Sequence, residues 1–110
     1  MRILAFSDLH VDRDAARDIV AASILADVVV GAGDFARRQV GLGECIKSLS
    51  GVGVPLLLVP GNHDDADEMR RVARIYPRMH VLHGERRVIA GQEFVGLGYE
   101  IPRVSQAVWS

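Results

Sequence analysis

Four residues with oxygen or nitrogen side-chain donors follow three short apolar runs of this 110-residue sequence. They are Asp8, His10, Asp34 and Asn62. The set contains no thiolate, and this mixture of donors suits borderline divalent cations such as manganese, iron or zinc better than it suits a structural zinc site. The donors therefore predict a site for divalent metal ions, provided that the fold brings them together.

Asp34 stands at the centre of this set, at similar distances along the chain from Asp8 and from Asn62. A carboxylate that bridges two cations lowers their repulsion and holds them ~3.5–4 Å apart, as two-metal hydrolases require. We therefore predict that Asp34 bridges two metal ions, and that such a pair serves the hydrolysis of a phosphate ester.

His63 and Asp64 follow Asn62 directly. Adjacent loop residues tend to point in different directions, so Asn62 can bind metal while His63 faces a substrate. Asp64 could accept a hydrogen bond from the imidazole and fix its tautomer, which suits a general acid for the leaving alkoxide. His63 and Asp64 are therefore the predicted catalytic residues.

The apolar runs that must position these residues lie at 3–6, 28–30 and 56–59. Continuous apolar runs rich in branched residues are typical of strands buried on both faces of a parallel sheet. The intervening segments are predicted to be helical, with Asp12 or Asp14 as a cap of the first helix. Helices are expected at about 12–24, 44–49 and 65–75, and further short strands at 81–83, 88–90 and 93–97.

This order of elements indicates an α/β fold with a βαβαβ-type sheet. Right-handed crossovers place the carboxyl ends of parallel strands at one edge of the sheet, where ligands bind. Asp8 and His10, Asp34, and Asn62 and His63 should therefore converge at that edge. This convergence is the central prediction.

At these residues the chain resembles the calcineurin-like metallophosphoesterase family. The match covers Asp8-x-His10, Gly33-Asp34 and Gly61-Asn62-His63-Asp64, in this order. The resemblance implies a two-sheet α/β sandwich of four layers, two divalent metal ions and hydrolysis of phosphomonoesters or phosphodiesters. It also implies that Asp8, His10 and Asp34 hold the first metal, that Asp34 and Asn62 hold the second, and that His63 is the acid or transition-state stabiliser.

The chain also departs from the family pattern, which continues with a Gly-His element and then Gly-His-x-His. Neither element occurs here, and His80 and His83 are interpreted as strand or surface residues. We therefore predict a single C-terminally truncated domain at 1–110, comparable to the first half of the sandwich, with one weakly bound ion. The alternative is a catalytically impaired fragment or interaction module that needs a second chain to complete the metal site.

The composition limits the classes of binding partner and the cellular compartment that we expect. The formal net charge of −1 gives no general attraction to membranes or nucleic acids, so nucleic acid is expected only as a substrate. The single cysteine, Cys45, excludes an internal disulfide and is interpreted as a core residue of a cytoplasmic protein. A missing second sheet would expose an apolar patch, so self-association is expected.

A glycine pattern at 31–36 could be mistaken for a dinucleotide-binding fingerprint. That fingerprint must open a helix at once and carry an acidic residue about 20 positions later. Gly41 and Gly43 interrupt the helix, and no acidic residue lies between Cys45 and Gly61. A dinucleotide site is therefore rejected.

Overall fold

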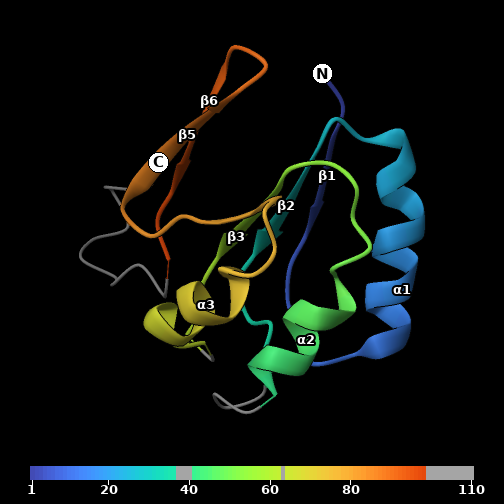
Figure 1. The fold of residues 1–110 in the computed structure, drawn as a ribbon, viewed down its shortest axis with the longest axis vertical. Coiled ribbons are helices and arrows are strands. Elements are labelled where there is room, and N and C mark those ends of the chain that lie inside the picture. Colours follow the sequence, from blue (N-terminus) through green and yellow to red (C-terminus); the bar gives the residue numbers. More distant parts are fainter. Residues whose placement is uncertain (37–40, 63, 99–110) are drawn as a thin grey trace, which may run out of the picture.

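The computed structural model describes residues 1–36, 41–62 and 64–98. It contains a four-stranded parallel sheet, in the order β1-β2-β3-β4, and a separate antiparallel hairpin (Figure 1). The strands of the sheet are β1 (Ile3–Phe6), β2 (Val28–Ala32), β3 (Leu56–Val59) and β4 (Met79–Val81). The hairpin consists of β5 (Glu85–Ile89) and β6 (Gln92–Gly96). The predicted α/β fold class is confirmed.

Two helices each begin after an aspartate whose side chain caps them. Asp12 accepts a hydrogen bond from the Ala15 amide at 3.0 Å and caps α1 (Arg13–Ala22), which continues into the 3₁₀ turn η1 (Ser23–Leu25). Asp65 accepts from the Asp67 and Glu68 amides and caps α3 (Ala66–Ala73). Without a side-chain cap, α2 (Leu42–Ser48) begins after Gly41 in a left-handed conformation. Asp12 is thus the cap of the first helix.

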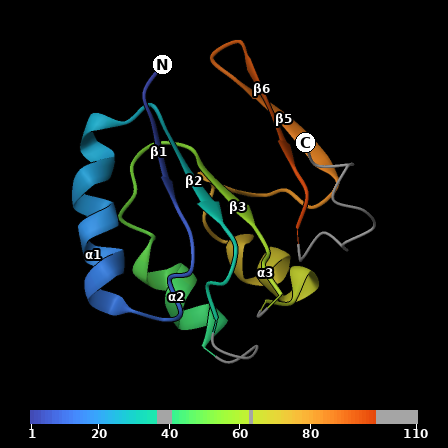
Figure 2. The same ribbon diagram turned by 180° about the vertical axis from the view of Figure 1, so that it is seen from behind.

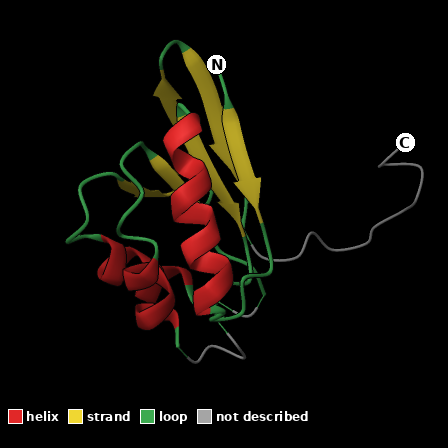
Figure 3. Cartoon of the chain, turned by 90° about the vertical axis from the view of Figure 1, so that its right-hand side faces the viewer, coloured by secondary structure: helices red, strands yellow, loops and turns green. Residues whose placement is uncertain are grey.

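The three helices lie on one face of the sheet (Figure 3). Neighbouring strands follow each other in sequence, and right-handed crossovers in one direction put every helix on the same side. The main core fills this interface, and it contains Ala16, Cys45, Ile46, Leu56, Leu58 and Met69. Cys45 is a core residue as predicted, and burial raises the pKa of its thiol to about 11.

The opposite face of the sheet is covered only in part. Ile89 and Phe94 of the hairpin pack against Val28, Leu57 and Leu82 in a second, smaller cluster. Ile3, at the far end of the sheet on β1, is 53% exposed. The prediction that all three strands are buried on both faces is therefore wrong for β1, because the hairpin covers β2, β3 and the end of β4.

Besides this packing, polar side-chain contacts join the hairpin to the rest of the described structure. The Arg87 guanidinium contacts Nδ1 of His80 on β4, and the Arg70 guanidinium donates to the Glu85 carboxylate at 2.5 Å. Burial, together with the nearby charge of Arg87, lowers the pKa of His80. His80 is thus a strand residue, as predicted, and His83 follows the same strand. Among the described residues, no helix is long and apolar enough to cross a membrane.

Candidate metal centre

The loops after β1 and β2 run side by side at the carboxyl edge of the sheet. Three backbone hydrogen bonds join them: the amides of Asp8, His10 and Val11 donate to the carbonyls of Gly33, Asp34 and Phe35 at 3.0, 3.0 and 2.9 Å. Because β1, β2 and β3 are parallel neighbours, their arrowheads end at the same edge (Figure 2). The predicted convergence of the strand ends is therefore confirmed for these loops.

Several residues of these loops have left-handed backbone conformations. The φ angles are +56° at Asp8, +47° at His10, +61° at Val11 and +56° at Asp34. Such conformations are uncommon for residues other than glycine, and strain of this kind gathers at ligand-binding sites. The interstrand hydrogen bonds of these loops hold the backbone in this conformation, and the Asp8, His10 and Asp34 side chains come together as a result.

Asp8, His10 and Asp34 offer donor atoms that all lie within 4.8 Å of one another. Oδ1 of Asp8 lies 3.7 Å from Nε2 of His10. An ion with bonds of about 2.0–2.2 Å separates opposite ligand atoms by up to ~4.4 Å, so small side-chain rotations would let these three donors share one cation. The three residues therefore fit a divalent metal ion.

The second ring nitrogen of His10 faces the main chain. Nδ1 lies 3.4 Å from the carbonyl oxygen of Ala36, which leaves Nε2 on the side of Asp8. A protonated Nδ1 would make Nε2 the lone-pair donor, and an outer contact of this kind orients metal-binding histidines in general. Nε2 of His10 is therefore the ring nitrogen that faces the Asp8 carboxylate.

The loop after β3 lies against Asp34. Gly61 is buried there, and a Cβ atom added to it would lie 2.2 Å from Oδ1 and 2.3 Å from the amide nitrogen of Asp34. Glycine is therefore required for this close approach. Asn62 follows with an exposed side chain, one residue beyond the contact with Asp34. His63 lies outside the described residues.

Asp64 has partners that the sequence did not predict. Its side chain is 1% exposed, and its carboxylate accepts from the amides of Phe35 at 3.2 Å, Ala36 at 2.8 Å and Gly61 at 2.8 Å. A carboxylate buried in this way positions loops and is shielded from substrate. The predicted hydrogen bond with His63 stays a prediction.

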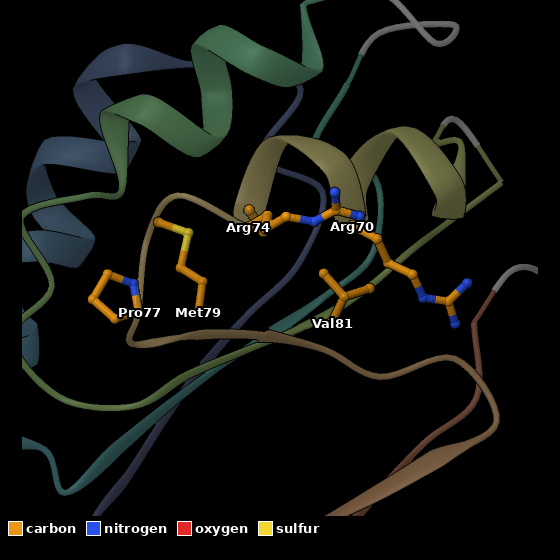
Figure 4. Close-up of a pocket in the computed structure, with 6 residues that line it drawn as sticks. Arg70, Arg74, Pro77, Met79 and Val81 are labelled. Atoms are coloured by element: carbon orange, nitrogen blue, oxygen red, sulfur yellow. The ribbon is translucent and has the colours of Figure 1, made fainter.

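Two surface cavities lie near the sheet and differ in their relation to this group. One of about 320 Å³ includes Gly33 and Gly61 in its lining, together with exposed Val95 and Leu97 of the hairpin region. Another of about 280 Å³ lies between α3 and β4 and is lined by Arg70, Ala73, Arg74, Pro77, Met79 and Val81 (Figure 4). Neither described lining contains Asp8, His10 or Asp34, but the first cavity borders the group through Gly33 and Gly61, which adjoin Asp34 and Asn62 in the chain.

The sequence model of the calcineurin-like phosphoesterase superfamily domain matches residues 1–100. The chain belongs to this superfamily. Because the superfamily is hydrolytic and its members usually bind divalent metals, the Asp8, His10 and Asp34 group is the metal-binding candidate within a phosphoesterase-type domain. The resemblance inferred from the sequence motifs is thereby confirmed.

Solved structures with the same fold are longer than this chain. The protein TT1561 of Thermus thermophilus matches with a TM-score of 0.80 and 25% identity, over 96% of this chain and 52% of that one. A second solved structure matches with a TM-score of 0.72 and 18% identity, over 89% of this chain and 52% of its own. A search of curated proteins found no match. The chain thus spans about half the length of the solved structures it resembles.

Proposed function

We propose that this chain is the metal-binding half of a phosphoesterase that hydrolyses phosphomonoesters or phosphodiesters with two divalent metal ions. The observation that carries the proposal is the grouping of Asp8, His10 and Asp34 within one superfamily match. Manganese, iron or zinc would suit these donors. The absence of a disulfide-forming pair of cysteines supports a cytoplasmic location.

Each residue has a distinct task in this proposal. Asp8, His10 and Asp34 would hold the first ion, and Asp34 and Asn62 would hold the second. When bound, the two ions supply Lewis acidity and an activated water for attack on phosphorus. His63 donates a proton to the leaving alkoxide, and the left-handed loops keep the donors directed at the same point.

The number of donors in this chain favours a second candidate function. Among the described residues, the ligands proposed for the second ion are Asp34 and Asn62, and the chain spans 52% of the first matched structure. A domain in this condition would be a catalytically impaired fragment or interaction module, and a second chain would complete the site. Metal stoichiometry separates the two functions.

Calorimetric titration with Mn²⁺ is the test of the proposed function. We expect the 110-residue chain to bind about one ion weakly, because affinity depends on ligand count and on preformed geometry. Hydrolysis of chromogenic phosphate esters should be feeble in the same preparation. Two tightly bound ions with robust turnover would rule out the second candidate function, the impaired fragment or interaction module. Failure to bind any divalent ion would contradict the proposal.

We also propose that the isolated chain self-associates through the open face of the sheet. Ile3 is 53% exposed, Val95 71% and Leu97 63%, and the cavity of about 320 Å³ adjoins the last two. Apolar surface that is left exposed in this way is normally covered by association. Sedimentation velocity should detect dimers or larger species that dissociate on dilution.

A matched pair of variants locates the contact. Ile3→Glu places a charge on the open face and should shift the chain toward monomer. Ile24→Glu changes an equally apolar residue that is 83% exposed on η1, and it should leave the distribution as in the wild type. A wild-type chain that stays monomeric at high concentration would rule out this association.

A further inference from the structure

Asp64 makes an unusual set of contacts for a buried acidic residue. Its carboxylate is almost inaccessible, and the hydrogen bonds described for it all come from backbone amides. Two of these amides, at Phe35 and Ala36, belong to the loop after β2. The third, at Gly61, belongs to the loop after β3. One side chain therefore joins two loops that each carry a predicted metal ligand.

The three metal-binding loops are held together in two different ways. Backbone hydrogen bonds join the loop after β1 to the loop after β2 at Asp8, His10 and Val11. The β2–β3 ladder ends at Ala32 and Val59. Beyond it, within 1–36, 41–62 and 64–98, the hydrogen bonds described between the second and third loops are those to Asp64. The first connection is made by backbone hydrogen bonds, whereas the second includes hydrogen bonds to the Asp64 side chain.

The hydrogen bonds of Asp64 help to keep Asn62 close to Asp34. Gly61 lies so close to Asp34 that a Cβ atom added to Gly61 would be 2.2 Å from Oδ1 of Asp34. The Asp64 carboxylate accepts hydrogen bonds both from the Gly61 amide and from the Phe35 and Ala36 amides, which follow Asp34. Loss of this connection would let the segment with Gly61 and Asn62 move away, while Asp8, His10 and Asp34 stay together.

We propose that Asp64 is a positioning residue that sets the second metal position relative to the first. This proposal rests on the proposed function, because it assigns Asn62 to a second ion. Asp64→Asn tests it with little change in shape, since an amide has one acceptor oxygen and brings N–H donors against amide donors. Asp65→Asn is the matched control, because it removes the same charge one residue later and asparagine caps helices as well as aspartate does.

The first arm of the experiment needs no metal. Amide hydrogen exchange followed by NMR should become at least tenfold faster at Phe35, Ala36 and Gly61 in Asp64→Asn, with β2 and β3 little changed. A general loss of stability would instead raise exchange across both strands. Wild-type exchange rates at these three amides in Asp64→Asn would overturn the proposal. The Asp65→Asn control should exchange as the wild type at all three.

The second arm uses Mn²⁺, whose unpaired electrons broaden the signals of nearby amides. In the wild type, the single ion expected near Asp8, His10 and Asp34 should broaden the amides of His10 and Asp34. It should also broaden those of Gly61 and Asn62, because Gly61 lies against Asp34. In Asp64→Asn it should persist at His10 and fall at least threefold at Gly61 and Asn62. Equal broadening of Gly61 and Asn62 in both proteins would overturn the proposal. Absence of broadening at His10 in the wild type would refute the proposed metal site, and the metal-free arm would then decide the role of Asp64.

A second variant covers the case in which Asp64→Asn does not fold. Gly61→Ala adds the Cβ atom that meets Asp34 and leaves the Asp64 carboxylate intact. It should reproduce the loss of broadening at Asn62, while the Phe35 and Ala36 amides stay protected. Wild-type broadening at Asn62 in a folded Gly61→Ala protein would show that this contact does not set the second position.

Discussion

Asp34→Asn should abolish divalent-cation binding and phosphate-ester hydrolysis together. The carboxylate lies with Asp8 and His10 in one donor group and also touches Gly61 beside Asn62, so it is the residue common to both proposed ions. A neutral amide is a poor bridge between two cations. The loss of Mn²⁺ affinity should exceed the about 10–100-fold effect typical of residues that only support a ligand. Titration calorimetry and an ester-hydrolysis assay measure both quantities.

The fold should tolerate this substitution. Asp34 has a φ of +56°, and asparagine is among the residues that adopt left-handed conformations most readily. The melting temperature without metal should therefore stay close to that of the wild type.

Comparison of His63→Ala with Asp34→Asn tests whether His63 acts as a general acid and Asp34 as a metal ligand. It should leave metal content nearly intact and lower turnover, most for substrates with poor leaving groups. Equal metal loss in Asp34→Asn and His63→Ala would show that this division of roles is wrong.

Phe35→Ala should lower the free energy of unfolding by about 3–5 kcal/mol. The Phe35 ring is fully buried beside the metal-binding group and meets the Phe6 ring edge to face, with centroids 5.7 Å apart and an interplanar angle of 87°. It also fills the space above Gly31, where a Cβ atom would lie 2.6 Å from its Cζ. Truncation would leave a cavity that these neighbours cannot close.

Urea denaturation of the metal-free protein measures this effect. Since small domains are stable by only about 5–15 kcal/mol, this loss removes a large share of the stability, and the urea midpoint should fall in proportion. Phe35→Leu keeps most of the buried volume and should cost clearly less. A loss below about 1 kcal/mol for Phe35→Ala would mean that the loop after β2 is not packed as described.

Much of the candidate site could be predicted because it depends on local patterns and on one topological rule. Three apolar runs predict parallel strands, and parallel strands end at one edge of a sheet. Asp8, His10 and Asp34 therefore had to meet, although they are far apart along the chain. The cap at Asp12 was one of two candidates in the sequence, since a capping side chain binds amides only two or three residues away. Asp65 caps α3 in the same way, although it was expected as the first residue of that helix.

The contacts of Asp64 could not be predicted in this way. Two of its partners are backbone amides 29 and 28 residues earlier in the chain, and a backbone amide leaves no mark in the residue types. The same holds for the left-handed conformations of Asp8, His10 and Val11, since β-branched valine in particular disfavours them. No composition or spacing signal in the sequence points to either feature.

The sequence by itself determined the order of strands and helices, the edge at which the donors gather and the superfamily motifs they belong to, because these follow from periodicity, caps and the direction of parallel strands. Only the tertiary structure decided how tightly the loops are joined, which side of the sheet is left open and what a buried carboxylate holds. These depend on contacts between residues distant in sequence, such as Asp64 with Ala36, and Phe94 with the cluster of Val28, Leu57 and Leu82. The physical reason is that such contacts form through packing and backbone hydrogen bonds, whose partners are chosen by the whole fold.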